Sequence, residues 1–237
     1  VPLMAQKMRK QDYQPLLDKL NYKFSSWMAR RLSFAGRLQL IKSVIYSAIN
    51  FWLSVFLLPN QCLLKLEQMC NAFLWEGAPN SARGAKIAWD VVCSSKKSGG
   101  LGLQRLADWN KVLALKLIWL LFTAAGSLWV SWMRLNLIAN MCFWDLNPYS
   151  TSSWIWRRLC KLRHLARPFL VCEIGSGENA SFWQDNWTCL GPLIDVTGAN
   201  GPLSVGLPIN AVVKDALRGN AWWLSSSRSR NLTIVIL

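Results

Sequence analysis

The amino-acid sequence predicts a mainly α fold, in which a helical bundle is followed by an α+β connector with a few short β-hairpins. The first observation is that apolar residues recur at helical spacing through most of residues 1–78. The second is that glycine, proline and β-forming residues separate further helical stretches in residues 79–190. The third is size, because 237 residues, 52% of them hydrophobic, can build a core for one large domain or two small ones.

Three long helices are expected in residues 1–78. Asp12 can cap a helix that carries leucines on one face and runs to about residue 27. Ser33 is a suitable N-cap for a second helix, which must end before Pro59 because proline cannot continue it. A third helix is expected over about residues 61–75. Its core positions are Leu63, Leu66, Met69, Cys70 and Phe73.

The connector, residues 79–190, is expected to alternate loops, short strands and helices. The expected elements are a loop at 76–86, a short strand at 86–93, a basic glycine-rich turn at 94–103, helices at about 108–123 and from 152 or 153 to 167, and a β-hairpin at 169–187. Pro168 is expected to stop the second of these helices. Residues 191–237 are rich in Gly, Pro and Ser, which predicts a linker.

The charge is strongly one-sided. The chain has 27 Lys and Arg against 12 Asp and Glu, a formal charge of +15, and no acidic residue lies between Asp18 and Glu67. A solvated helix surface normally mixes both signs, because opposite charges three or four residues apart stabilise it. The imbalance therefore favours a polyanionic partner: nucleic acid first, and an anionic membrane surface second.

Nine basic residues are the candidates for phosphate contact. They lie at the start of the second expected helix, in the glycine-rich turn and on the helix expected at 153–167. They are Arg30, Arg31, Arg37, Lys42, Lys96, Lys97, Arg157, Arg158 and Lys161. At the helix start, backbone N–H groups and the helix dipole also favour an anion. The alternative for each group is an ordinary solvated surface whose long side chains cover apolar residues.

No metal or catalytic site is expected. The seven cysteines are widely spaced without a C-x-x-C pair, and the chain has a single histidine, His164. The eight aspartates are scattered, whereas two-metal chemistry needs clustered carboxylates. The glycine-rich stretches "GGLG" and "GSG" lack the patterns of phosphate-binding and dinucleotide-binding loops. The chain is therefore expected to be inactive alone and to hold no cofactor.

Two uncharged, apolar runs, residues 43–64 and 117–133, approach the length of a membrane span. In the first run apolar residues follow i, i+3, i+4 spacing with polar residues between them, which favours a helix in a protein core. No membrane is therefore expected as a partner. A start at Val1 and an apolar end, "NLTIVIL", are expected for a piece of a longer protein.

Several motifs in order resemble the plant LINE-type (non-LTR) retrotransposon reverse transcriptases, in the part that follows the polymerase palm. They cover about 190 residues. The motifs are "VPL" at 1–3, "LSFAGRLQLIKSV" at 32–44 after Trp27, "LLP" at 57–59, "FLWEG" at 73–77, "KIAWDVVCSSKKSGGLGL" at 86–103, Asn110, and "GSGENASFWQDNW" at 175–187 followed by Pro192 and Leu193.

The resemblance implies that residues 1–78 are a thumb-like helical domain that grips the template–primer duplex. Residues from 79 would be the connector, leading through 191–237 to a zinc-binding region beyond Leu237 and, in many plant elements, to a ribonuclease H domain. The catalytic aspartates would lie before Val1, so Mg²⁺ would be needed only by the parent polymerase. Implied partners are an RNA template, a DNA primer or their hybrid, together with the palm, fingers and zinc-binding regions of the parent protein.

The implied location is intracellular, in the nucleus. Two alternatives stay open: a membrane-associated or helical scaffold protein, and an inert remnant of a decayed element.

Replacing Arg30 and Arg31 by alanine should weaken binding to duplexes of every sequence alike. Phosphate contacts release condensed counterions, so the log–log dependence of affinity on salt should become shallower by up to about 1.8 units. Replacing Arg228 and Arg230, in the Ser-rich tail, is the matched control. Titrations at several salt concentrations measure both, and a larger loss in the tail variant would contradict the assignment.

Overall fold

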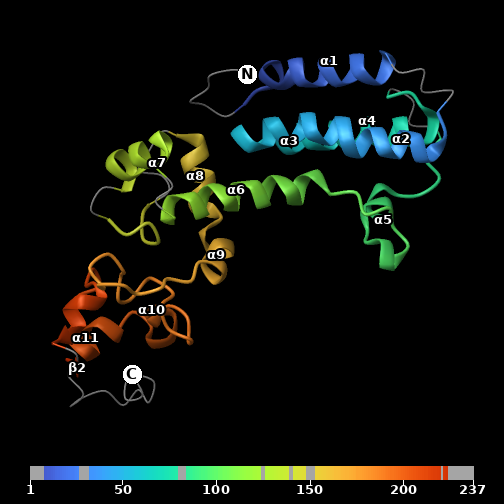
Figure 1. Cartoon of the computed structure of the whole chain (residues 1–237). Helices are drawn as coiled ribbons and strands as arrows, with labels where there is room; N and C mark the ends of the chain where they lie inside the picture. The colour runs from blue at the N-terminus through green and yellow to red at the C-terminus, as the bar shows by residue number, and fades with distance from the viewer. Residues whose placement is uncertain are drawn as a thin grey trace. The chain divides into compact units, whose positions relative to one another are not determined.

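The computed structural model describes residues 8–26, 32–79, 84–123, 126–138, 141–147, 153–219 and 221–223. The chain forms two compact units. The first comprises Val1–Leu117 and Ser152–Trp156, and the second comprises Ile118–Thr151 and Arg157–Leu237. Figure 1 shows that helices dominate the described chain, and the two-stranded antiparallel sheet pairs Leu217–Arg218 with Ala221–Trp222. The prediction of a mainly α fold with short β elements is confirmed.

The described part of the first unit is built mainly from long helices. Its elements are α1 (Lys10–Ser26), α2 (Phe34–Leu40), the π-helical turn η2 (Ile41–Ile45), α3 (Tyr46–Val55), α4 (Asn60–Glu76), α5 (Trp89–Cys93), the 3-10 turn η3 (Lys96–Ser98) and the first part of α6 (Leu106–Phe122). Helix α4 contacts both α1 and α2. Its Phe73 ring lies 4.7 Å from that of Phe24 on α1, and both side chains are buried.

The ends of these helices follow the sequence signals closely. The Oγ atom of Ser33 accepts a hydrogen bond from the Gly36 N–H at 3.2 Å, so Ser33 is the predicted N-cap. The helical stretch that it starts ends at Val55, before Pro59. Asp12 lies inside the first turn of α1, where its carboxylate accepts from the Arg9 N–H at 2.6 Å. It therefore caps from the third helical position rather than from the N-cap.

The helical stretch Phe34–Val55 has 22 residues and a mean hydropathy of 1.2. By length and composition it is the one helix among the described residues that could cross a membrane. The core helix of a soluble protein passes the same test, and 33% of this stretch's apolar window is buried. Ile41, Ile45 and Ile49 are fully buried along one face, where they join the core of the first unit.

The prediction of a short strand over residues 86–93 is wrong, because Trp89–Cys93 form helix α5. The Ala88 carbonyl accepts from the N–H groups of both Val91 and Val92. Val92 is buried, and Trp89 and Cys93 pack against the same core. This spacing of three and four residues is helical, so packing against the core overrides the β-forming character of the segment.

The second unit consists of short elements joined by loops. They are the end of α6, α7 (Leu128–Met133), η4 (Arg134–Ile138), α8 (Trp154–Lys161) from Arg157 on, α9 (Arg163–Ala166), η5 (Arg167–Phe169), α10 (Leu193–Thr197), α11 (Gly201–Val205), η6 (Val213–Ala216), β1 (Leu217–Arg218) and β2 (Ala221–Trp222). The single helix expected over 153–167 is therefore divided at Leu162, and Pro168 lies within η5.

The β-hairpin expected over residues 169–187 is also absent from the described residues, where an isolated parallel bridge joins Val171 and Asn186. Residues around 181 pair instead with a later segment. The Phe182 N–H donates to the Ala211 carbonyl at 2.9 Å, and the Trp183 indole donates to the Pro208 carbonyl at 3.0 Å. The hydrogen-bonding partner of this segment therefore lies about 30 residues further along the chain, and not across a local turn.

Residues 191–219 are folded, which corrects the expectation of a linker over this part of 191–237. They form α10, α11, η6 and β1, and they supply most of a buried cluster. Its members are Ala180, Phe182, Trp183, Leu193, Val205, Ala211, Val213 and Ala216. Several of the glycines and prolines that suggested a linker lie at the ends of these short helices, where Gly206 has a φ of 76° and Pro202 is the second residue of α11.

The segment 101–106 is held to the helices of the first unit by three side chains. Lys42 donates to the Leu101 carbonyl at 3.0 Å, and the Tyr46 hydroxyl donates to the Gln104 carbonyl at 2.8 Å. The Glu67 carboxylate accepts from the Leu106 N–H at 2.8 Å, at the first residue of α6. Glu67 is 8% exposed, and burial raises the pKa of its carboxyl group.

Replacing Glu67 by alanine should lower the free energy of unfolding by about 1 to 3 kcal/mol, because the buried Leu106 N–H loses its acceptor. Replacing it by glutamine keeps an acceptor and should cost less. The raised pKa of Glu67 also determines the direction in which stability changes with pH. Burial disfavours the ionised carboxylate in the folded state. The wild type should therefore lose stability relative to the glutamine variant as the pH rises. The loss should begin above the unfolded-state pKa of Glu67 and continue through its folded-state pKa. Urea titrations across this pH range measure both effects, and an equal loss in both variants would contradict the capping role.

Candidate nucleic-acid interface

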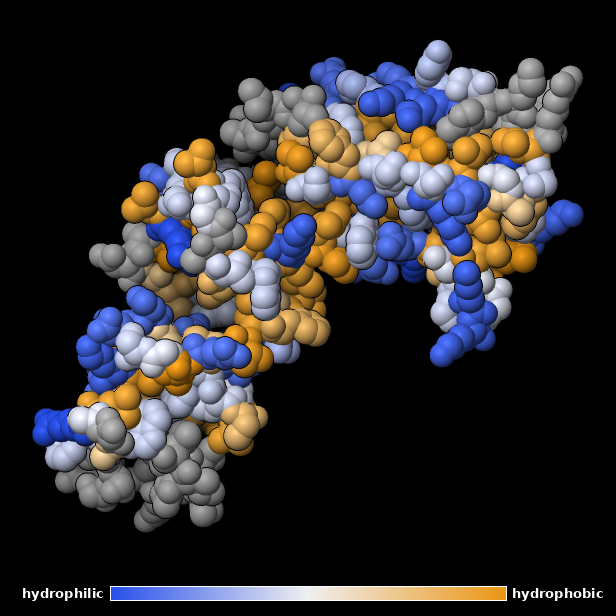
Figure 2. Space-filling model, viewed as in Figure 1, coloured by the Kyte–Doolittle hydropathy of each residue, from blue (hydrophilic) through white to orange (hydrophobic). Residues whose placement is uncertain are grey.

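The glycine-rich turn of the first unit has a fixed conformation that leaves two lysines in solvent. Ser95 begins η3, and its Oγ accepts from the Ser98 N–H at 3.2 Å. Gly99 has a φ of 82°, and a Cβ atom on Gly100 would lie 2.1 Å from the Ser94 carbonyl oxygen, so both positions require glycine. Lys96 and Lys97 are exposed. In Figure 2 hydrophilic residues cover the tip of the segment that Figure 1 labels α5.

Lys42 is joined to this turn, although it lies more than 50 residues earlier in the sequence. Its ammonium group is partly buried and donates to the Leu101 carbonyl, directly after the two glycines. One of its three donors is therefore used to hold the turn. Of the nine predicted residues, Lys42, Lys96 and Lys97 are thus brought to one part of the first unit.

The next predicted group lies before and within α2. Arg37 lies in the last turn of α2 and is half-buried. Its Nε atom is buried and has no hydrogen-bond partner among the described residues. Arg30 and Arg31 lie outside the described residues, so their place relative to the Ser33 cap stays a prediction.

The basic excess is concentrated in the first unit. This unit contains 17 Lys and Arg against 6 Asp and Glu, a formal charge of +11, whereas the second contains 10 against 6, a formal charge of +4. Exposed ion pairs join Arg105 to Asp90 and Lys111 to Asp108, each at 3.2 Å. Such exposed pairs are weak, so these side chains still contribute to the summed field.

A second basic group lies on α8, in the part that belongs to the second unit. Arg158 and Lys161 are exposed and Arg157 is half-buried, while Leu159 and Cys160 are buried on the opposite side of the helix. The helix is therefore amphipathic. These three residues belong to a different unit from Lys42, Lys96 and Lys97, so the nine predicted residues form at least two groups.

Arg163, four residues after Leu159, has an internal role that its sequence did not reveal. Its guanidinium donates to the Phe143 and Trp144 carbonyls, each at 2.6 Å, and to the Leu146 carbonyl at 2.8 Å. Its Nε donates to the carbonyl of Cys160 at 2.9 Å. It therefore holds residues 143–146 in place. The sequence pattern around a basic residue that lies between apolar ones does not show whether its side chain points to solvent or into the protein.

The thiols and carboxylates offer no metal site in the described chain. No group of three or more His, Cys, Asp or Glu residues gathers there. All seven cysteines are free. Burial raises the pKa of Cys62 and Cys93 to about 12 and that of Cys142 to about 11, so these thiols are protonated near neutral pH. They serve as small apolar side chains.

Replacing Arg163 by alanine should lower the free energy of unfolding of the second unit by at least about 2 kcal/mol, because four backbone carbonyls lose a charged donor. Arg158→Ala, which removes the same charge from an exposed position of the same helical region, should change stability by less than about 0.5 kcal/mol. Thermal unfolding at several salt concentrations distinguishes the loss of a charge from the loss of the internal hydrogen bonds. Equal losses would show that charge, and not the internal hydrogen bonds, sets the effect.

Comparison with known proteins finds relatives in a plant. An Arabidopsis thaliana protein named "Putative ribonuclease H protein" is 29% identical over 227 residues, which cover 94% of this chain and 36% of that protein. A second protein of the same plant, named "Uncharacterized mitochondrial protein", is 26% identical over 136 residues, which cover 57% of this chain and 88% of that protein. No family model matches the chain. The chain is therefore related to plant proteins, and it spans about a third of the relative that is named for ribonuclease H.

Proposed function

We propose that this chain is the thumb and connector portion of a plant LINE-type (non-LTR) retrotransposon reverse transcriptase, and that it grips template–primer nucleic acid without catalysing a reaction itself. The observation that carries the proposal is the anchored basic turn. Exposed Lys96 and Lys97 project from a loop fixed by glycines and by Lys42, in a unit with a formal charge of +11. A rigid loop presents its charges at little entropic cost on binding.

The relatives support a retroelement origin. The resemblance to LINE-type elements implies that a ribonuclease H domain follows the connector in many plant members, and a relative that covers 94% of this chain is named for ribonuclease H. This chain spans 36% of that protein, which leaves room for both a polymerase part and a nuclease part in a longer parent. The catalytic aspartates and the Mg²⁺ that they bind belong to that parent in this proposal.

The proposed mode of binding is contact with phosphates. Lysine ammonium groups act as compact point charges on the backbone of a duplex, and such contacts carry no sequence information. This suits a polymerase thumb, which must hold a template–primer of any sequence. Within the second unit, the exposed residues Arg158 and Lys161 of α8 are the proposed phosphate contacts. The nucleus is the proposed location, and the palm, fingers and zinc-binding regions of the parent are the proposed protein partners.

Replacing Lys96 and Lys97 together by alanine should weaken binding to an RNA–DNA hybrid and to duplex DNA. It should also make the salt dependence shallower by up to about 1.8 log–log units, since two condensed-counterion contacts are lost. The matched control is Lys111→Ala with Lys116→Ala, which removes the same charge from exposed positions of α6 in the same unit. Fluorescence anisotropy at several salt concentrations measures both double variants.

The control pair should leave the slope nearly unchanged if contact is local to the turn. Equal changes in both pairs would mean that only the summed charge matters, and the basic turn would lose its assigned role. Anionic lipid vesicles test the membrane alternative, which the apolar stretch Phe34–Val55 would favour. Tight binding to vesicles, with none to nucleic acid, would overturn the proposed function.

A further inference from the structure

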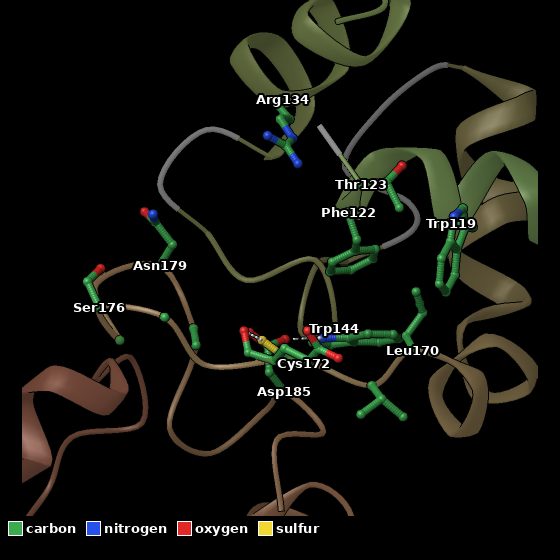
Figure 3. A pocket seen from close by; sticks show the side chains of 15 residues that line it. Trp119, Phe122, Thr123, Arg134, Trp144, Leu170, Cys172, Ser176, Asn179 and Asp185 are labelled. Carbon is green, nitrogen blue, oxygen red and sulfur yellow. Dashed lines mark hydrogen bonds between the residues drawn. The ribbon is translucent and has the colours of Figure 1, made fainter. Parts of the chain in front are cut away.

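The second unit contains a cavity of about 570 Å³ that the basic residues do not line, apart from Arg134. Its walls come from the end of α6, from η4, from residue 144 and from the loop at 170–180, all within the second unit. Figure 3 shows aromatic side chains of α6 on one side, Ser176 and Asn179 on the other, and Trp144 with Asp185 along the floor. The volume lies in the range of small-ligand sites, which is about 300–1,000 Å³.

The aromatic wall is fixed in orientation. The rings of Phe122 and Trp144 are stacked, with centroids 5.3 Å apart and planes inclined by 20°. The Trp144 indole donates to Asp185 Oδ1 at 3.0 Å, and the Arg167 guanidinium carbon lies 5.4 Å from the centroid of the Trp144 ring. Trp144 is therefore held by a hydrogen bond and by two ring contacts. Phe122 is 37% exposed and Trp119 is 48% exposed, so this wall has aromatic surface available to a ligand.

The opposite side offers polar groups on a fixed loop. The Gly177 carbonyl accepts from the Lys214 N–H at 3.1 Å, and Gly177 has a φ of 74°, which anchors the loop in a conformation that glycine favours. Ser176 and Asn179 are exposed beside it and line the cavity, on the side opposite the aromatic residues of α6 in Figure 3. An amide and a hydroxyl can donate to and accept from the edge of a planar heterocycle.

The charges of the cavity limit the ligand. Arg134 donates to the Leu121 carbonyl through Nε at 3.0 Å and also through Nη2, which fixes one positive charge at the rim. Both oxygens of Asp185 are used, by the Trp144 indole and by the Ser181 N–H at 2.8 Å. Glu173 adds a second negative charge. One arginine and two carboxylates do not suit a polyphosphate, whereas a base with a single adjoining phosphate is compatible with them.

We propose that this cavity takes one unpaired nucleobase of a single-stranded stretch of nucleic acid. The base would stack on the Phe122 wall, its edge would meet Asn179 and Ser176, and its phosphate would lie near Arg134. The choice of nucleic acid as the ligand rests on the proposed function. The cavity adds a selectivity that the basic turn lacks, namely preference for an unpaired base over a paired one.

The test compares the full chain on three DNA duplexes: blunt, with a single-stranded overhang, and with an abasic overhang that keeps the phosphates. The wild type should bind the overhang more tightly than the other two. Phe122→Leu keeps an apolar side chain but removes the ring, and it should reduce the overhang advantage by about 5- to 100-fold, the range expected for one stacked base. Its affinity for the blunt duplex should stay unchanged. Phe169→Leu, the same change at an exposed ring that does not line the cavity, should have no effect.

Asn179→Ala provides a variant on the exposed loop, where loss of folding is not expected. It should reduce the overhang advantage by about 2- to 10-fold through one lost hydrogen bond. Equal binding of normal and abasic overhangs by the wild type would overturn the proposal, as would an unchanged overhang advantage in both cavity variants. Salt-dependent binding of the blunt duplex reports on the proposed function separately, so failure of the cavity alone leaves that function standing, and failure on every duplex removes both.

Discussion

The first unit depends on a buried carboxylate at the start of a helix. Glu67 on α4 accepts from the first N–H group of α6, in the core between the long helices. An unpaired carboxylate in that position would be costly, but the N-terminal N–H groups of a helix and its dipole favour negative charge. One residue of α4 therefore holds the start of α6. Asn110, one turn further along α6, adds a second fixed point by donating to the Leu58 carbonyl at 3.1 Å.

This arrangement explains why the basic turn can be rigid although it lies at the surface. The turn is tied on one side to α5, where the Leu101 N–H donates to the Val92 carbonyl at 2.9 Å, and on the other to α6 through the segment that Glu67 caps. Lys42 and Tyr46 are four residues apart and hold that segment from the same face of one helix. A surface that needed only positive charge would not require hydrogen bonds that hold the turn in one conformation.

Local signals in the sequence predicted the fold of the first unit well. Ser33, Pro59 and the apolar positions of α4 act within a few residues of themselves, so their effect is visible in sequence. The predictions of a strand at 86–93 and of a hairpin at 169–187 are wrong because the partners of these segments are distant in sequence. Val92 packs into a core made by other helices, and Phe182 pairs with Ala211. For the candidate site, residue type predicted positive charge, but it could not separate exposed Arg158 from inward-pointing Arg163. The cavity was missed because its walls meet only in three dimensions.

The distant pairing of Phe182 and Trp183 also bears on the order in which the protein folds during synthesis. These two side chains are buried against residues up to Val213, which are made about 30 residues later. At translation rates of about 5–20 residues per second, they wait roughly 2 to 6 s before their partners leave the ribosome. Two large aromatic side chains are exposed during that interval, next to a growing chain that cannot yet cover them. The second unit therefore exposes part of its aromatic core to other proteins while it is being synthesised.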